Sequence, residues 1–150
     1  MKAVIQRVDC AKLSVDGNII SQIGQGLVVY VGVEQGDSEA NVVAFSQKLV
    51  NLRIFSDANG KMNLSVTDVK GDILLVSNFT LCADISHGNR PSFTGAMRPP
   101  LAAKEMFDYC ADVVRDLMRQ AGLQDNVKCG VFGADMLIEQ NNCGPVTIIY

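Results

Sequence analysis

The chain has 150 residues, of which 48% are hydrophobic and 19% are charged, and its formal net charge at pH 7 is −3. This length and composition are typical of one globular domain, so we expect residues 1–150 to form a single domain with one core. The 13 Lys and Arg residues are scattered, which disfavours a grip on a long phosphate backbone and gives no reason to expect DNA binding, although a pocket for the end of an RNA remains compatible.

The five cysteines are odd in number and none belongs to a Cys-x-x-Cys pair, which predicts reduced thiols. The first residues do not form a signal peptide, and no apolar run reaches the roughly 18 residues of a membrane span. We therefore expect a cytoplasmic protein without a membrane segment. His87 is the only histidine and its neighbours are typical of a solvated loop, so we expect no metal centre and no cofactor.

The first third of the chain has the pattern of strands. Residues 3–8 are rich in β-branched side chains, which favours an opening strand. Residues 13–15 and 19–20 flank Asp16-Gly17, and this pair suits the positive φ angles of a tight hairpin turn. Residues 26–33 are almost entirely apolar, which indicates a strand that is covered on both faces.

A first helix is predicted over residues 39–52, where Asp37-Ser38 provides the cap. Its apolar residues recur at steps of three and four and should form the buried stripe: Val42, Phe45, Leu49 and Leu52. Residues 53–55 and 62–66 are predicted as strands around a turn at residues 57–60. Residues 73–77 are predicted as a central strand.

Residues 82–100 form a long irregular segment with several Gly and Pro residues, and loops of this length are usually functional or disordered. A second helix is predicted over residues 101–121, with Pro99-Pro100 just ahead of it. Its predicted apolar stripe is Met106, Cys110, Val113, Leu117 and Ala121.

Residues 127–132, 136–139 and 146–150 are predicted as the remaining strands. Two main helices among about eight strands predict an α/β protein in which the helices pack on one face of a mixed, largely antiparallel sheet.

Ser77-Asn78-Phe79-Thr80-Leu81 places two hydroxyls, an amide and an aromatic ring at the end of the central strand. These groups could donate hydrogen bonds to an ester or amide oxygen and offer a surface to a base or ring. Thr80 would need a base to act as a nucleophile, and no histidine lies near it in sequence. A strand end with satisfied hydroxyls is the alternative interpretation.

Asn142-Cys143-Gly144-Pro145-Val146-Thr147 places Gly-Pro ahead of a β-branched run. Proline donates no hydrogen bond to a sheet ladder and belongs at the start of a strand or on an edge. One interpretation is a turn that opens the last strand. The other is a rigid backbone corner that presents its carbonyls to a ligand.

Taken together, the two motifs resemble those of the D-aminoacyl-tRNA deacylases, and the resemblance extends along the whole chain. That family has Ser-Gln-Phe-Thr-Leu at its strand end and Asn-x-Gly-Pro-Val-Thr near its C-terminus. Further stretches resemble recurring stretches of the family in the same order: residues 5–8, residues 53–57 with residues 60–64, residues 90–93 and residues 132–136.

The resemblance implies a deacylase-like three-layer fold and a homodimer that hydrolyses the ester between a D-amino acid and the 3′ end of tRNA. It implies that Ser77, Asn78, Phe79 and Thr80 bind the substrate and that backbone amides at Phe79 and Thr80 hold the carbonyl, with help from the terminal ribose 2′-hydroxyl. It also implies that Gly144 and Pro145 form a cis corner. This corner reaches into the partner's pocket and rejects L-amino acids.

If the corner only rejects L side chains and no pocket binds a D side chain, glycyl-tRNA should be hydrolysed too.

Asn78 departs from the family, because it stands where the family has glutamine and is one methylene shorter. Two alternatives remain open from the sequence. One is an ester hydrolase with Thr80 as its nucleophile, and the other is a non-catalytic dimer that binds the tRNA 3′ end.

Overall fold

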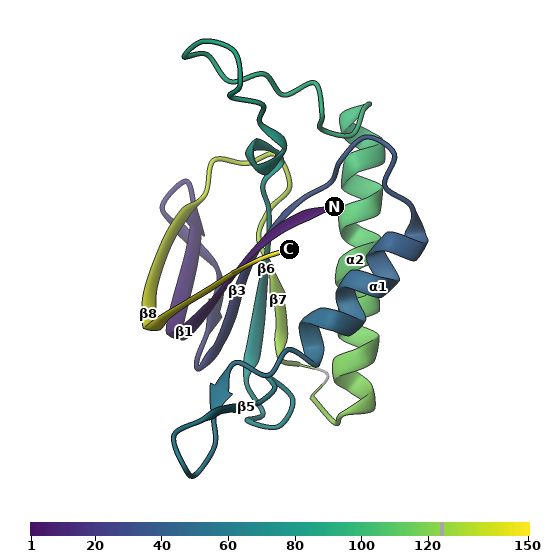
Figure 1. Cartoon of the computed structure of the whole chain (residues 1–150). Helices are drawn as coiled ribbons and strands as arrows, with labels where there is room; N and C mark the ends of the chain where they lie inside the picture. Colours follow the sequence, from purple (N-terminus) through teal and green to yellow (C-terminus); the bar gives the residue numbers. More distant parts are fainter. Residues whose placement is uncertain (124) are drawn as a thin grey trace.

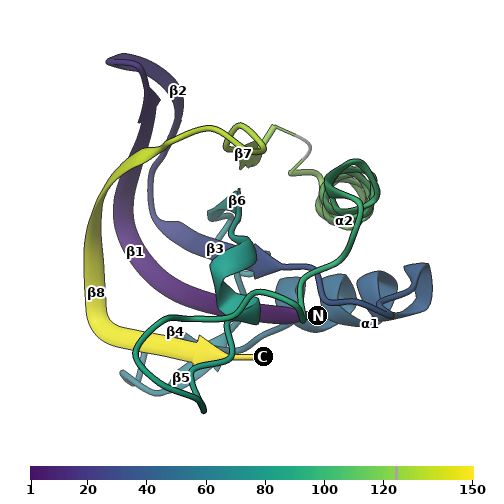
Figure 2. The same cartoon turned by 90° about the horizontal axis from the view of Figure 1, so that it is seen from above.

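The computed structural model describes residues 1–123 and 125–150. Two helices lie beside a curved sheet, and a small hairpin stands at one end of the molecule (Figures 1 and 2). The elements in chain order are β1 (Lys2–Val15), β2 (Asn18–Ile23), β3 (Gly26–Gly32), α1 (Glu39–Val50), β4 (Phe55–Ser56), β5 (Met62–Leu64), β6 (Asp72–Ser77), the 3-10 helix η1 (Phe79–Cys82), α2 (Pro100–Gln120), β7 (Val127–Cys129) and β8 (Leu137–Ile149).

Strand β1 is paired along both of its edges. One edge pairs with β3 and then with β2, and the other edge pairs with β8 along most of its length. These pairs and the β4–β5 hairpin are antiparallel, whereas β6 runs parallel to both β3 and β7. The predicted mixed, largely antiparallel sheet is therefore confirmed.

Both helices pack on the same face of the sheet, as predicted (Figures 1 and 2). Successive residues of a strand point to opposite faces, so Val29 joins the core under the helices while Val28 joins a second, smaller core on the other face. All of β3 except Tyr30 is buried, which confirms the prediction of a strand that is covered on both faces.

Helix α1 begins as predicted, because Ser38 and Asn41 form a capping box at its N-terminus. Val42, Phe45 and Leu49 are buried in the core under the helices. The helix ends at Val50, two residues before the predicted end at Leu52.

The predicted apolar stripe of α2 packs against the core except at Ala121, but it is not the most deeply buried row of the helix. Of that set only Cys110 is buried; Met106, Val113 and Leu117 are half-buried and Ala121 is exposed. The buried row is Phe107, Cys110, Ala111, Val114 and Met118. The apolar surface of α2 is wider than one row, and contacts with α1 and the sheet decide which row lies at its centre.

The hairpin at Asp16-Gly17 is confirmed, since both residues have positive φ angles of 50° and 77°. The predicted strands at residues 3–8 and 13–15 are parts of one continuous strand, β1.

Strand β8 is likewise continuous from Leu137 to Ile149, where two strands were predicted. Its pairing with β1 shifts register twice between Gln6 and Cys10. These irregularities let Pro145 sit inside the strand without a ladder hydrogen bond, as proline does on edge strands.

Strand β7 ends at Cys129 rather than at the predicted residue 132. The segment after η1 is irregular, as predicted, and it is tied to the end of β3 by hydrogen bonds from the Gln35 N–H to the Gly95 carbonyl (2.8 Å) and from the Met97 N–H to the Val33 carbonyl (2.9 Å).

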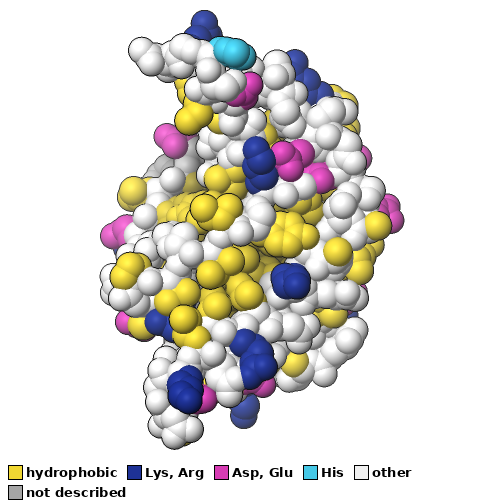
Figure 3. Space-filling view, in the orientation of Figure 1, with side chains coloured by type: hydrophobic (Ala, Val, Ile, Leu, Met, Phe, Trp, Pro, Cys, Tyr) yellow, Lys and Arg dark blue, Asp and Glu magenta, His cyan; other side chains and the backbone are white. Residues whose placement is uncertain are grey.

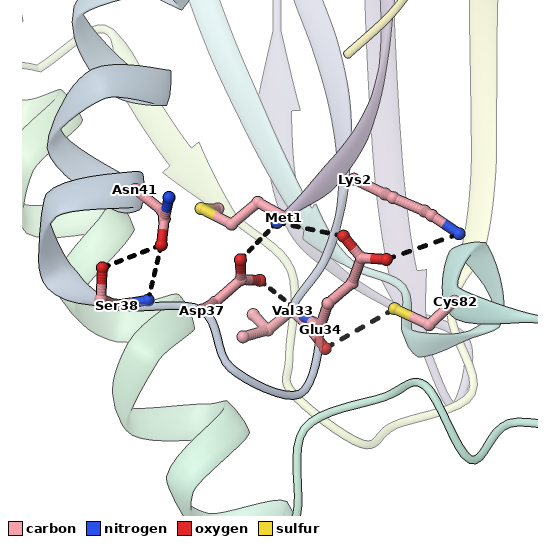
Figure 4. A network of polar contacts seen from close by, with 8 residues as sticks. All are labelled: Met1, Lys2, Val33, Glu34, Asp37, Ser38, Asn41 and Cys82. Atoms are coloured by element: carbon pink, nitrogen blue, oxygen red, sulfur yellow. Dashed lines mark hydrogen bonds and ion pairs between the residues drawn. The ribbon is translucent and has the colours of Figure 1, made fainter.

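A polar network fixes the ends of β1 and β3 beside η1 (Figure 4). The Met1 ammonium pairs with Asp37 and with Glu34, the latter at 3.1 Å, and the Glu34 N–H donates to Asp37 at 2.6 Å. The Cys82 thiol donates to the Val33 carbonyl at 3.6 Å. Burial by itself would lower the pKa of the Met1 ammonium, but Asp37 and Glu34 raise it above its ordinary value overall.

The five cysteines, all of which are described, form no disulfide. No helix in the described part of the chain is long and apolar enough to cross a membrane.

Candidate active site

A cavity of about 410 Å³ opens where β6 ends. Residues 77–80 form its floor, and the wall across from them comes from residues 132–136. Ala96 and Met97, which belong to the long segment after η1, and Tyr30 of β3 are also among the lining residues. Burial raises the pKa of the Tyr30 hydroxyl, so Tyr30 enters the cavity as a neutral phenol. The strand-end motif predicted from the sequence therefore lies at a cavity.

The side chain of Asn78 is turned back onto its own chain. It caps η1, because its Oδ1 accepts hydrogen bonds from the Thr80 N–H (3.2 Å) and from the Thr80 hydroxyl. This local contact holds the amide of Asn78 close to the backbone. The N–H of Phe79, by contrast, has no acceptor among the described residues. Of the two backbone amides expected to hold a carbonyl, only Phe79 offers an unused donor.

The ring of Phe79 stands at the rim of the cavity and is 59% exposed. It meets the ring of Phe93 edge to face, with 5.1 Å between the ring centroids. Together the two rings form a partly exposed aromatic surface beside the cavity. The pair provides the aromatic surface that the sequence pattern predicted.

No base contacts the Thr80 hydroxyl in the described part of the chain. Its hydrogen bond goes to Asn78. The nearest carboxylate in sequence, Asp84, accepts instead from the Ser86 N–H at 2.9 Å, and hydrogen bonds from Ser86 lower the pKa of Asp84. His87 is exposed in the loop, as predicted. The arrangement lacks the activated hydroxyl that a nucleophile needs.

The Gly144–Pro145 peptide bond is cis, and both residues are exposed. Gly144 has a φ angle of 129°, and a Cβ atom placed on it would lie 2.9 Å from the Val146 nitrogen and 3.1 Å from Arg7 Nη2. Only glycine fits this position, because both the backbone angle and the space exclude a side chain. The peptide bond has the cis geometry that the resemblance implied, and the action of this corner on a ligand stays a prediction.

Arg7 holds the corner from the face of the sheet that carries the helices. Its Nε donates to the Cys143 carbonyl at 3.1 Å and its Nη1 donates to the Ile54 carbonyl at 2.6 Å. The motifs in the sequence did not predict a role for Arg7. Arg7 lies between the apolar residues Ile5 and Val8 of a strand. A charged residue in such a place usually has a partner, and this pattern could have indicated its role.

The cavity and the corner lie apart within one chain. Gly144 and Pro145 do not line the cavity. The corner lies beside Gln6 of β1. Gln6 pairs with Val28 of β3, and Val28 in turn pairs with Leu74 of β6. Ser77 is about 10 Å further along β6, and three strand spacings of about 4.8 Å separate β6 from β8. The two predicted motifs therefore do not meet in one chain.

Known proteins match this chain along almost its whole length. The family model described as D-Tyr-tRNA(Tyr) deacylase matches residues 4–150. A D-aminoacyl-tRNA deacylase from Carboxydothermus hydrogenoformans is 49% identical over 99% of this chain and 98% of its own length. Its counterpart from Syntrophomonas wolfei is 48% identical over 99% and 95% of the two chains.

Two solved structures also match over nearly the full length. One is described as c-Myc DNA Unwinding Element Binding Protein, with a TM-score of 0.92, 38% identity and coverage of 100% of this chain and 97% of that one. The other is a probable eukaryotic D-amino acid tRNA deacylase, with a TM-score of 0.83 over 99% and 97% of the two chains; its 16% identity supports the fold alone. With a family model across residues 4–150 and relatives near one-half identity, the resemblance found in the motifs is confirmed: the chain belongs to the D-Tyr-tRNA(Tyr) deacylase family.

Proposed function

We propose that the protein hydrolyses the ester bond of D-aminoacyl-tRNA and releases free tRNA and the D-amino acid. Membership of the deacylase family and relatives named D-aminoacyl-tRNA deacylase support this activity. The observation that carries it is the unused N–H of Phe79 at the floor of the cavity, beside Ser77, Asn78 and Thr80. These four residues bind the aminoacylated 3′ end of the tRNA.

The Phe79 N–H donates to the ester carbonyl oxygen and stabilises the negative charge that develops on it. Water adds to the carbonyl carbon, the ester oxygen leaves with a proton as the ribose hydroxyl, and the neighbouring 2′-hydroxyl assists this transfer. An aminoacyl ester is already labile, and one placed oxyanion donor supplies about 2.7–4 kcal/mol, or roughly a hundred- to a thousandfold in rate. The mechanism uses no protein nucleophile and no cofactor.

Thr80 has a positioning role in this proposal. Its hydroxyl donates to Asn78, and no described base contacts it. The Asn78 cap in turn sets the start of η1, and Phe79, the first residue of η1, lines the cavity. The shorter side chain of Asn78 is compatible with catalysis because the backbone of this segment makes the contact with the ester.

Chiral selection is proposed to come from the Gly144–Pro145 corner of the partner in a homodimer. The carbonyls of the corner face the α-carbon of the bound amino acid and leave no room for an L side chain. A backbone held by Arg7 excludes one hand more sharply than a side chain with free rotamers does. A substrate with only hydrogens on its α-carbon meets no obstacle, so glycyl-tRNA is hydrolysed as well.

Two features of the molecule support the homodimer. Strand β8 pairs only with β1 among the described strands, and its other edge is open. Hydrophobic side chains also gather across the middle of the face on which the chain termini lie (Figure 3), and Ile149 at the end of β8 is 82% exposed. A second copy covers this surface and brings its corner to a cavity that the corner cannot reach within one chain.

The test is loss of ester from D-tyrosyl-tRNA and L-tyrosyl-tRNA on incubation with the protein. We expect rapid loss of the D-ester and little loss of the L-ester above the spontaneous rate. Equal loss of both esters would remove the proposal of chiral selection. Binding of charged tRNA without loss of either ester would show a non-catalytic RNA-end-binding dimer. A trapped acyl group on Thr80 would show a threonine-nucleophile hydrolase.

A further inference from the structure

A chain of amide and hydroxyl groups connects the cavity to the strand that carries the corner. The Tyr30 hydroxyl donates to Gln140 Oε1 at 3.1 Å. The Gln140 amide donates to Gln6 Oε1 at 2.7 Å and to Asn142 Oδ1 at 2.6 Å. The Gln6 amide donates to the Thr147 hydroxyl at 3.3 Å. Tyr30 lines the cavity, so the network begins there and ends on residues that flank Gly144–Pro145.

Every polar group of the Gln140 side chain is used in this network. Its oxygen accepts from Tyr30, and its nitrogen has two acceptors, Gln6 and Asn142. A carboxamide can be reversed with little change in shape, so its orientation is set by its partners. Here the oxygen faces the Tyr30 phenol and the nitrogen faces the side-chain oxygens of Gln6 and Asn142, so each polar atom of the carboxamide has a partner. Gln140 therefore links Tyr30 to both of these side chains.

The network holds the corner from the face of the sheet opposite to Arg7. Gln6 and Arg7 are consecutive in β1 and so point to opposite faces. Arg7 binds the carbonyl of Cys143, just before the corner. Gln6 binds Thr147, just after it, while Gln140 binds Asn142. Both flanks of the corner are anchored, from both faces of the sheet.

We propose that Gln140 and Gln6 are positioning residues that set the chiral selectivity of the enzyme by fixing both flanks of the Gly144–Pro145 corner. The inference rests on the proposed function, because the corner is the group that rejects L-substrates. Discrimination by exclusion depends on how closely the corner keeps its place, since a small displacement opens room for a side chain. Loss of the Gln140 donor frees Asn142 and Gln6 and lets the corner move.

The variant that tests this is Gln140→Glu, which keeps the size of the side chain and an oxygen for Tyr30 but removes the donor to Gln6 and Asn142. The matched control is Gln22→Glu, an exposed glutamine on β2 that takes no part in the network. Two readouts are compared with the unchanged protein. One is the ratio of L- to D-tyrosyl-tRNA deacylation rates, and the other is hydrogen–deuterium exchange over residues 142–148.

We expect Gln140→Glu to raise the L:D rate ratio at least tenfold and to speed exchange over residues 142–148 at least tenfold, while Gln22→Glu changes neither. Unchanged exchange over these residues overturns the positioning role, whatever the activity. Faster exchange with an unchanged L:D ratio overturns the role in selectivity. If Gln140→Glu does not fold, Gln140→Met, which brings no charge, is judged by the same two criteria. A protein that hydrolyses no D-tyrosyl-tRNA contradicts the proposed function, and the exchange readout still decides the positioning role.

Discussion

The side chain of Thr80 donates its hydroxyl proton to Asn78, the residue that caps η1. Removing that hydroxyl with Thr80→Val should loosen the start of η1, where the Phe79 N–H lies, without removing this donor. One hydrogen bond of this kind contributes about 0.5–1.5 kcal/mol, so we expect kcat/KM for D-tyrosyl-tRNA to fall about three- to tenfold. Single-turnover deacylation measures the change.

The same substitution distinguishes positioning from nucleophilic attack. If Thr80 were the nucleophile, Thr80→Val would abolish hydrolysis while tRNA binding stayed intact. A covalent adduct on Thr80 in the unchanged protein would contradict the positioning role equally.

At the scale of residues, the sequence predicted the groups that lie next to each other in the chain. Residues 77–80 and Gly144–Pro145 were recognised because each motif is short and continuous. Tyr30, Gln6 and Gln140 were missed because their contacts join positions 110 and 134 residues apart. Such contacts depend on the register of β8 against β1. This pairing is irregular, because its register shifts twice. Short-range patterns do not encode this register.

At the scale of elements, β3 and β6 meet so closely that Gly26 has no room for a side chain. A Cβ on Gly26 would lie 2.0 Å from the carbonyl oxygen of Asp72, which is backbone at the start of β6. We expect Gly26→Ala to lower the free energy of unfolding by about 1–3 kcal/mol or more, because the two strands must move apart. Urea denaturation followed by circular dichroism measures this change.

Gly24→Ala is the matched control for the same strand connection. A Cβ on Gly24 meets only the side chain of Asp72, at 3.7 Å, which is ordinary contact. Its free energy of unfolding should stay near that of the unchanged protein. Equal stability of Gly26→Ala and Gly24→Ala would contradict the close approach of β3 and β6.

The elements themselves were predicted best where local chemistry decides them. The helix cap at Ser38 and the turn at Asp16-Gly17 were both recognised from the chain. The buried row of α2 and the continuity of β8 were not, because they follow from packing against elements distant in sequence. Helix periodicity shows that an apolar face exists, but a wide face leaves its centre undetermined.

At the scale of the whole molecule, the account requires two chains for one working site. The corner at Gly144–Pro145 does not line the cavity of its own chain. We therefore expect specific activity to fall when the protein is diluted below the dissociation constant of the dimer. Sedimentation velocity and deacylation rates at matched concentrations measure this dependence. A monomer with full activity would refute the proposal that the corner acts in the partner's cavity.

Selection by exclusion makes a prediction about the smallest substrate. An L side chain that meets the corner costs several kcal/mol, which at about 1.4 kcal/mol per tenfold corresponds to discrimination of a thousandfold or more. Glycine meets no obstacle and loses only apolar contact, which is worth about 1–3 kcal/mol at most. Glycyl-tRNA should therefore be hydrolysed much more like a D-substrate than like an L-substrate.

The most direct measurement is deacylation of glycyl-, D-alanyl- and L-alanyl-tRNA by the same preparation under identical conditions. The account predicts rapid hydrolysis of D-alanyl-tRNA, hydrolysis of glycyl-tRNA within about a hundredfold of it, and L-alanyl-tRNA left at least a thousandfold slower. Glycyl-tRNA as resistant as L-alanyl-tRNA would mean that the cavity selects D side chains positively, and exclusion by the Gly144–Pro145 corner would be wrong.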